Sequence, residues 1–475
     1  MPQVQEPPER AGQLVRTLGV RQIVFMVVAM AAPLTVVSGV IPLMIALGNG
    51  VGAPLDFVVM GAVLMLFTVG FSAMTPEVDD AGAFSSYVEK GLGRIAGLGT
   101  AALAIATYSV LLVSVAAYLG AAAHSALVTL AGVSIPWWAL SAVCLLAIGF
   151  LGHRNIEVSA RALGVLLVAE VLIVIVLDAA IILRGGDHGL TTQPFTWDAF
   201  RHGAVGTGVM FAIFGFIGFE ATAVFRSEAR DPDRTIPRAT YAAVLLIAAL
   251  YTVSAWAVVV GVGTDKAVET ASNDPVALTP DLATAYVSVV AHDLVQVLLT
   301  TSFFACVLTV HNVVSRYTFT LGHKGVLPRR FAAVHARHRS PYLASIVTSI
   351  VVFTALAALA LLGLDPVVQI YAWFGGAGTL GLILLLCLTS VAVVVHFRRT
   401  PSRVSLWKGS VAPGTAAAGL LATLFLVLSN FELLIGSRPA AYAFVAFLGV
   451  AFVGGVACAL RPAAPRPSGE ELRRL

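Results

Sequence analysis

Two carboxylates lie deep inside apolar stretches of this sequence. Glu220 is the single charge in the run 203–225, and Glu170 lies within the run 158–183. An ionisable side chain at membrane depth is costly, and burial disfavours its charged form. Such a carboxylate can hold an amine, or it can take up and release a proton. The alternative for each is a neutral, hydrogen-bonded side chain that only packs against its neighbours.

The segment that carries Glu220 is interrupted just before that residue. Gly215 and Gly218 weaken a helix at this point because glycine lacks a side chain and costs conformational entropy to order. Hydrocarbon tolerates a broken helix only where protein or water surrounds the freed backbone groups. A break beside a buried carboxylate therefore predicts a binding site.

The first apolar stretch also contains residues that break helices. Pro33 and Pro42 flank Ser38–Gly39, and each proline removes a backbone donor and clashes with the preceding turn. Interrupted segments at matching places in two halves of a chain are typical of the binding site of secondary transporters. Half-helix N-termini offer N–H groups to an anion and half-helix C-termini offer carbonyls to a cation, so a zwitterion suits the pair. The alternative is a pair of ordinary helix kinks.

Twelve apolar runs, each long enough to cross a hydrocarbon core of about 30 Å, follow one another along the chain. The chain is 58% hydrophobic and 11% charged, whereas soluble domains carry about 25% charged residues. We therefore expect an all-α integral membrane protein with about 12 transmembrane helices. The expected segments are 20–48, 52–74, 95–124, 135–152, 158–183, 203–225, 237–263, 292–321, 341–364, 366–396, 409–430 and 440–460.

The positive charges are distributed unequally between the two sets of alternating loops. Of the 29 Lys and Arg residues, 25 fall on the side of the N-terminus. By the positive-inside rule, both termini are expected in the cytoplasm and the protein in the cytoplasmic membrane. Residues 77–94 are then a cytoplasmic reentrant or amphipathic stretch. Residues 268–291 form an outer loop that could hold a short helix and act as a lid.

Other classes of chemistry find no support in the sequence. The four cysteines lie inside apolar runs without metal-ligand spacing, and His311 has no second ligand at such a spacing. Neither a nucleophile motif nor a phosphate-binding glycine loop occurs, so no enzyme, metal site or cofactor is expected. The net charge of +4 follows from the basic loops. It predicts contact with the lipid bilayer and no nucleic-acid partner.

Four stretches together resemble the amino acid–polyamine–organocation (APC) superfamily of permeases. They are AAPLTVVSGVIP (31–42), AGAFSSYVEKGLGR (81–94), FIGFEATAVFRSEARDPDRTIPRAT (216–240) and NVVSRYTFTLGHKGVLP (312–328). The likeness runs from about residue 20 to 400. It implies a LeuT-type fold, an inverted 5+5 repeat plus two peripheral helices. The parts implied are a cytoplasmic tail 1–19, repeats 20–184 and 203–397, peripheral helices 409–460 and a cytoplasmic tail 461–475.

The resemblance also implies which residues bind substrate. Backbone amides would hold a carboxylate, carbonyls of the second break would face an amino group, and the aromatic ring of Phe214 would close over the substrate. The substrate-binding candidates are Ser38, Gly39, Val40, Phe214, Gly215, Ile217 and Gly218. Glu220 matches a glutamate that senses acid in an arginine–agmatine antiporter of the superfamily.

At Glu170 the sequence departs from one branch of the superfamily. Cationic amino acid transporters carry a lysine eleven residues after the Ser of a Ser–Ala–basic triplet in the fifth span. Here the triplet Ser159–Ala160–Arg161 leads to Glu170, so a lysine-based coupling scheme is excluded. A carboxylate that cycles a proton, one that holds a cation and one that merely packs are the three alternatives.

The function expected from these features is secondary active transport. We expect the chain to import an amino acid or related amine together with protons, and Glu170 and Glu220 are the proton-coupling candidates. A polyamine or amine exchanger and a non-transporting membrane sensor with the same fold are the alternatives. The sequence leaves open the identity of the substrate, the coupling mode and the oligomeric state.

Overall fold

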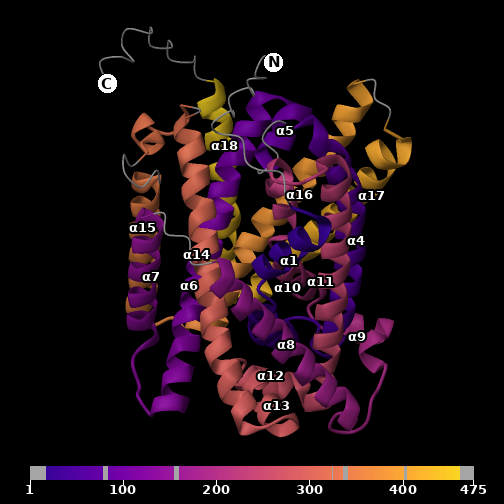
Figure 1. The fold of residues 1–475 in the computed structure, drawn as a ribbon, viewed down its shortest axis with the longest axis vertical. Helices are drawn as coiled ribbons and strands as arrows, with labels where there is room; N and C mark the ends of the chain where they lie inside the picture. Colours follow the sequence, from indigo (N-terminus) through magenta and orange to yellow (C-terminus); the bar gives the residue numbers. More distant parts are fainter. Residues whose placement is uncertain are drawn as a thin grey trace, which may run out of the picture.

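The structure is a computed structural model that describes residues 18–78, 84–154, 160–323, 325–334, 341–400 and 404–460. Within these ranges the chain is helical, with no strand and one isolated β-bridge between Leu18 and Ala229. The helices run roughly along the long axis of the molecule and form one bundle (Figure 1).

The twelve expected segments all form helices. Eleven stretches of the described chain are long and apolar enough to cross a membrane, and α7 adds a shorter apolar helix. The ninth and tenth runs, which touch in the sequence, are separate helices. The main helices are α1 (Val20–Met30), α4 (Ala53–Met74), α6 (Arg94–Ala131), α7 (Trp137–Arg154), α8 (Ala160–Arg184), α10 (Val205–Gly215), α11 (Pro232–Val262), α14 (Val289–His323), α15 (Tyr342–Leu361), α16 (Ala372–Arg399), α17 (Ala412–Ile435) and α18 (Arg438–Leu460).

The helices differ in how deeply they are buried. The helix α6 lies in the interior, packed against α14, α16 and α18. By contrast, α18 exposes large apolar side chains such as Phe447, Val450 and Val453. Large apolar side chains exposed along a helix of this kind are expected to face the hydrocarbon of the membrane. The inner helices, α6 foremost, are therefore those that can position a buried site.

The two ends of the bundle carry different short helices (Figure 1). At one end, here called the α5 end, α5 (Phe84–Leu92) packs against α6 and α16 with Phe84 and Tyr87 buried. At the other, here called the lid end, the loop 268–291 forms α12 (Ala267–Asn273) and α13 (Leu278–Tyr286). The loop 268–291 thus holds the short helix expected of it, and part of the stretch 77–94 is helical as well. Residues 79–83 of the first loop lie outside the described part of the chain.

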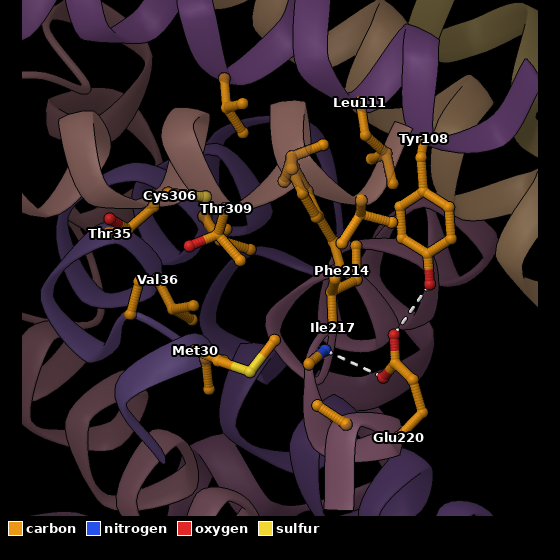
Figure 2. A pocket seen from close by; sticks show the side chains of 18 of the residues that line it. Met30, Thr35, Val36, Tyr108, Leu111, Phe214, Ile217, Glu220, Cys306 and Thr309 are labelled. Atoms are coloured by element: carbon orange, nitrogen blue, oxygen red, sulfur yellow. Dashed lines mark hydrogen bonds between the residues drawn. The ribbon is translucent and has the colours of Figure 1, made fainter. Parts of the chain in front are cut away.

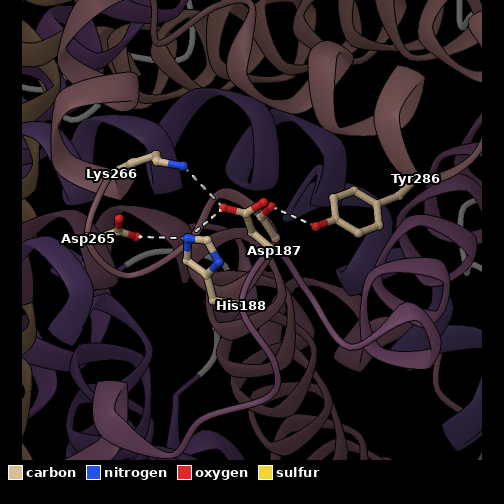
Figure 3. Close-up of polar contacts among 6 residues, drawn as sticks. Asp187, His188, Asp265, Lys266 and Tyr286 are labelled. Carbon is tan, nitrogen blue, oxygen red and sulfur yellow. Dashed lines mark hydrogen bonds and ion pairs between the residues drawn. The ribbon is translucent and has the colours of Figure 1, made fainter.

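Polar contacts tie the lid end together. Lys266 lies 3.5 Å from the Asp187 carboxylate that follows α8, and His188 lies 3.3 Å from the same carboxylate. The hydroxyl of Tyr286 donates to the carbonyl of Gly261 at 2.8 Å. Figure 3 shows these groups converging where the ends of α8, α11 and α13 meet. Deeper in the bundle, the Thr279 hydroxyl of α13 donates to the carbonyl of Val37 at 3.3 Å, so the lid rests on the first segment.

The first segment is broken, but one to two turns earlier than Ser38–Gly39. α1 ends at Met30, and Ala32 adopts a left-handed conformation with φ 45°. The residue before a proline is disfavoured in the helical region, which explains the break before Pro33. Helix then continues through α2 (Pro33–Thr35), the π-helical turn η1 (Val36–Val40) and α3 (Ile41–Leu47). The π-turn accommodates Pro42, since its wider hydrogen-bonding pattern tolerates an inserted residue.

The sixth segment is broken where the glycines predict. The helix α10 ends at Gly215, Gly218 has φ +108°, and the 3₁₀ helix η5 runs from Phe219 to Ser227. Only glycine adopts this φ without strain. The two broken segments contact each other: α1 packs on η5, and η1 packs on α10.

Candidate functional site

A cavity of about 130 Å³ lies between the two breaks, α6, α14 and the start of α16. Most of its wall is apolar. The apolar side chains of the wall include Val36, Val40, Leu111, Val115, Val310 and Val313. Such a lining suits a ligand that presents an apolar side chain, with polar groups reserved for its orientation.

Glu220 stands at one end of this cavity and is held by two hydrogen bonds (Figure 2). The hydroxyl of Tyr108 donates to its Oε1 at 2.9 Å, and the backbone N–H of Gly218 donates to its Oε2 at 2.9 Å. Each carboxylate oxygen therefore has a donor. Tyr108 lies 112 residues before Glu220, so no local pattern in the sequence pointed to this contact.

Four aromatic rings close the cavity on the side of the lid end. Tyr118 stacks on Phe303 with ring centroids 4.3 Å apart, and Tyr371 lies 5.4 Å from Phe214 and 4.7 Å from Tyr118. Tyr118 and Phe303 lie in the halves of α6 and α14 nearer the lid end, Tyr371 lies directly before α16, and Phe214 lies near the end of α10. On the other side the cavity reaches Phe84 of α5. The described site is thus closed by rings toward the lid and extends toward the α5 end.

Two buried hydroxyls near the cavity have no hydrogen-bond partner among the described residues. They belong to Tyr371, which lines the cavity, and to Ser38, which lies behind its wall. An unpaired buried polar group costs free energy. The Tyr371 hydroxyl is therefore a ready ligand for a polar group of a bound molecule. In the sequence, Tyr371 follows an apolar stretch, and nothing there distinguishes it from a residue that only packs in the core.

The structure brings some of the expected substrate residues together and leaves others behind the wall. Val40, Phe214, Ile217 and Gly218 line the cavity. Ser38, Gly39 and Gly215 are fully buried but do not line it. Rings cover Gly39, because a Cβ there would lie 3.0 Å from Phe303 Cζ and 3.3 Å from the Tyr371 hydroxyl. The carbonyl of Ser38 accepts a hydrogen bond from Tyr118 at 2.8 Å.

Glu170 lies beside a second cavity, of about 150 Å³, next to the first. The two cavities share Met30, Ala32, Cys306 and Thr309 as lining residues. The Ser302 hydroxyl donates to Glu170 Oε2 at 2.8 Å. The carboxylate therefore has a polar partner on α14, which the sequence did not reveal.

Further carboxylates are buried away from both cavities. Asp178, further along α8, accepts a hydrogen bond from Ser254 at 2.6 Å. Asp56, at the start of α4, accepts one from the side chain of Asn49 at 2.8 Å. Among the described residues no group of three or more His, Cys, Asp or Glu side chains is placed to hold a metal ion.

Comparison with known proteins gives a consistent picture. The model of the amino acid permease family matches residues 22–459. The branched-chain amino acid permease BcaP of Bacillus subtilis is 25% identical over 292 residues, covering 60% of this chain and 58% of that protein. The aromatic amino acid transport protein AroP of Escherichia coli K12 is 25% identical over 296 residues, covering 61% and 63%.

A shorter alignment links the chain to an uncharacterised transporter of Mycobacterium tuberculosis, 34% identical over 153 residues, or about a third of each protein. In all three cases the alignment spans less than two thirds of the relative's length. The family model, by contrast, extends across nearly all the described helices. The chain is therefore an integral membrane protein of the APC superfamily and belongs to the amino acid permease family.

Proposed function

We propose that this protein imports an amino acid with a bulky apolar side chain across the cytoplasmic membrane, with the α5 end in the cytoplasm. The observation that carries the proposal is the cavity between two broken helices, which combines an apolar wall with a few polar groups. The orientation rests on the 25 Lys and Arg residues on the side of the N-terminus. The relatives named for branched-chain and aromatic amino acids support the same substrate class.

In the proposed binding mode, the substrate is held by groups of both breaks. Its amino group faces the carbonyls at the end of α10, near Phe214, Gly215 and Ile217, where the C-terminal end of a helix favours a cation. Its carboxylate lies near the start of the helical run that begins at Pro33, and it accepts a hydrogen bond from the unpaired hydroxyl of Tyr371. The amides of Ser38, Gly39 and Val40 join this set when the rings of Phe303 and Tyr371 move aside.

An amine or polyamine exchanger is less well supported by this site. A dication would need carboxylate oxygens free to accept its hydrogen bonds. In the described part of the cavity wall, Glu220 is the one carboxylate, and Tyr108 and Gly218 already take one acceptor site on each of its oxygens, so the second charge of a dication has no carboxylate partner there. A neutral apolar amino acid needs no second carboxylate.

We further propose that import is coupled to protons through Glu170, with Glu220 as the second candidate. Glu170 lines the second cavity and not the adjoining substrate cavity, so it can change protonation without contacting substrate. Glu220 lines the substrate cavity itself, so its substitution should change substrate affinity together with pH dependence.

A thermal-shift screen of the purified protein tests the substrate class, because a ligand that binds only the folded state raises apparent stability. We expect leucine, isoleucine, valine and phenylalanine to raise the melting temperature, and arginine, agmatine and putrescine to leave it unchanged. Uptake of the same radiolabelled amino acids into proteoliposomes then separates transport from binding. Stabilisation by the amines alone would favour the exchanger.

A further inference from the structure

Three side chains from three helices form a continuous hydrogen-bonded chain between the two cavities. Glu170 of α8 accepts from Ser302 of α14 at 2.8 Å, and the Ser302 oxygen lies 2.9 Å from that of Thr35 in α2. All three are buried, with exposed fractions of 5%, 1% and 5%. Glu170 and Ser302 line the second cavity, and Thr35 lines the substrate cavity, as Figure 2 shows.

The direction of these hydrogen bonds depends on the charge of Glu170. A charged carboxylate can only accept, and each hydroxyl has one proton to donate. Ser302 therefore gives its proton to Glu170, and Thr35 must give its own to Ser302. Thr35 then has no proton left, and it presents only lone pairs to the substrate cavity.

Protonation of Glu170 reverses the chain. The carboxylic acid now donates to Ser302, Ser302 donates to Thr35, and the Thr35 proton is released for a bond into the cavity. The oxygen–oxygen distances of 2.8 and 2.9 Å suit an O–H···O bond in either direction. The heavy atoms need not move, because only the hydroxyl protons rotate.

We propose that Ser302 and Thr35 form a relay that reports the protonation state of Glu170 to the substrate. The relay offers the substrate carboxylate a hydrogen-bond donor at Thr35 only when Glu170 carries a proton. This inference rests on the proposed function, and it makes Ser302 a positioning residue that acts through Thr35. Amino acid binding and proton uptake are thereby linked, and the linkage is reciprocal.

The other groups that face Glu170 do not neutralise it. Tyr251 of α11 and Cys306 of α14 are its titratable neighbours, and the Tyr251 hydroxyl donates to the carbonyl of Ala31 at 3.0 Å. Asp178 lies on the same helix but is bonded to Ser254. Among the described residues, no Lys or Arg forms an ion pair with Glu170. Ser302 is therefore the group through which a change at Glu170 is transmitted.

Calorimetry on the purified full chain, with leucine as the probe, tests the relay. Titrations in buffers of different ionisation enthalpy count the protons taken up per leucine bound. We expect the wild type to take up protons when it binds leucine. Leucine affinity should be on the order of tenfold to a hundredfold higher when Glu170 is protonated, which is the effect of a hydrogen bond to a charged group. Affinity should therefore rise as pH falls.

The variants separate the relay from general damage. Ser302→Ala and Thr35→Val should bind leucine without proton uptake and with an affinity that does not change with pH. Thr35→Ser keeps the hydroxyl and should retain uptake. Ser254→Ala removes a similar bond, from a serine of α11 to Asp178 of α8. This control variant should also retain proton uptake. For a variant that binds weakly, thermal shifts at saturating leucine between pH 5 and 8 provide the same comparison.

Proton uptake that persists in both Ser302→Ala and Thr35→Val would overturn the relay, and so would release of protons on leucine binding. Loss of uptake in Thr35→Ser with binding retained would also contradict it. These results differ from failure of the proposed function, in which the wild-type protein itself binds no amino acid.

Discussion

Replacement of Gly39 by valine should weaken substrate binding strongly while leaving membrane insertion intact. A Cβ at Gly39 would lie 3.0 Å from Phe303 Cζ and 3.3 Å from the Tyr371 hydroxyl. The first distance is tight enough to require a shift of the ring, and the two further methyl groups of valine add to the crowding. Overpacking of this kind costs about 1–3 kcal/mol. If the cost falls on the closed, substrate-bound state, leucine affinity should fall about five- to 150-fold.

A graded series makes the origin of this effect measurable. Gly39→Ala needs only a small displacement of Phe303 and should lie between wild type and Gly39→Val. Phe303→Leu removes the contacting ring edge, so the double variant should regain part of the lost affinity, which a double-mutant cycle quantifies. Gly449→Val is the matched control, since nothing lies within 4 Å of a Cβ at that glycine in α18.

The assays are leucine uptake into proteoliposomes and leucine-dependent thermal shift, with surface expression as the check on insertion. Normal uptake by Gly39→Val would refute the assignment of this part of the first segment to the site. An equal loss in Gly449→Val would show that added bulk harms the protein generally.

Three further predictions concern coupling, closure and orientation. Glu170→Gln mimics the protonated form and should preserve exchange in proteoliposomes but remove acceleration by an inward proton gradient; a full response to the gradient would leave Glu220 as the proton site. Phe214→Ala removes a ring that packs 5.4 Å from Tyr371 and should raise Kd by thermal shift, whereas Phe214→Trp should bind nearly as wild type. A reporter fused after Leu475 should be active in the cytoplasm and one inserted in the loop 268–291 only outside; the reverse pattern would invert the proposed orientation.

The sequence by itself determined the helical segments and one of the two breaks. Each of the twelve apolar runs is helical in its described part, two of them with a break, because backbone groups in hydrocarbon must be satisfied within their own segment. The break at Gly215 and Gly218 was equally local, since a φ of +108° is accessible only to glycine. In the first segment the prolines predicted a break, and it lies at Ala32, directly before Pro33, while the chain stays helical through the π-turn Val36–Val40 and past Pro42.

Only the tertiary structure decided which side chains meet. Glu170 and Ser302 are 132 positions apart, and Ser302 and Thr35 are 267 positions apart. Tyr371 and Tyr108 read as ordinary aromatic residues until the fold placed one in the cavity without a partner and the other on Glu220. Periodicity and helix breakers are properties of neighbouring residues, so one chain reveals them. Contacts between distant helices depend on how those helices pack and rotate, and no local pattern encodes this.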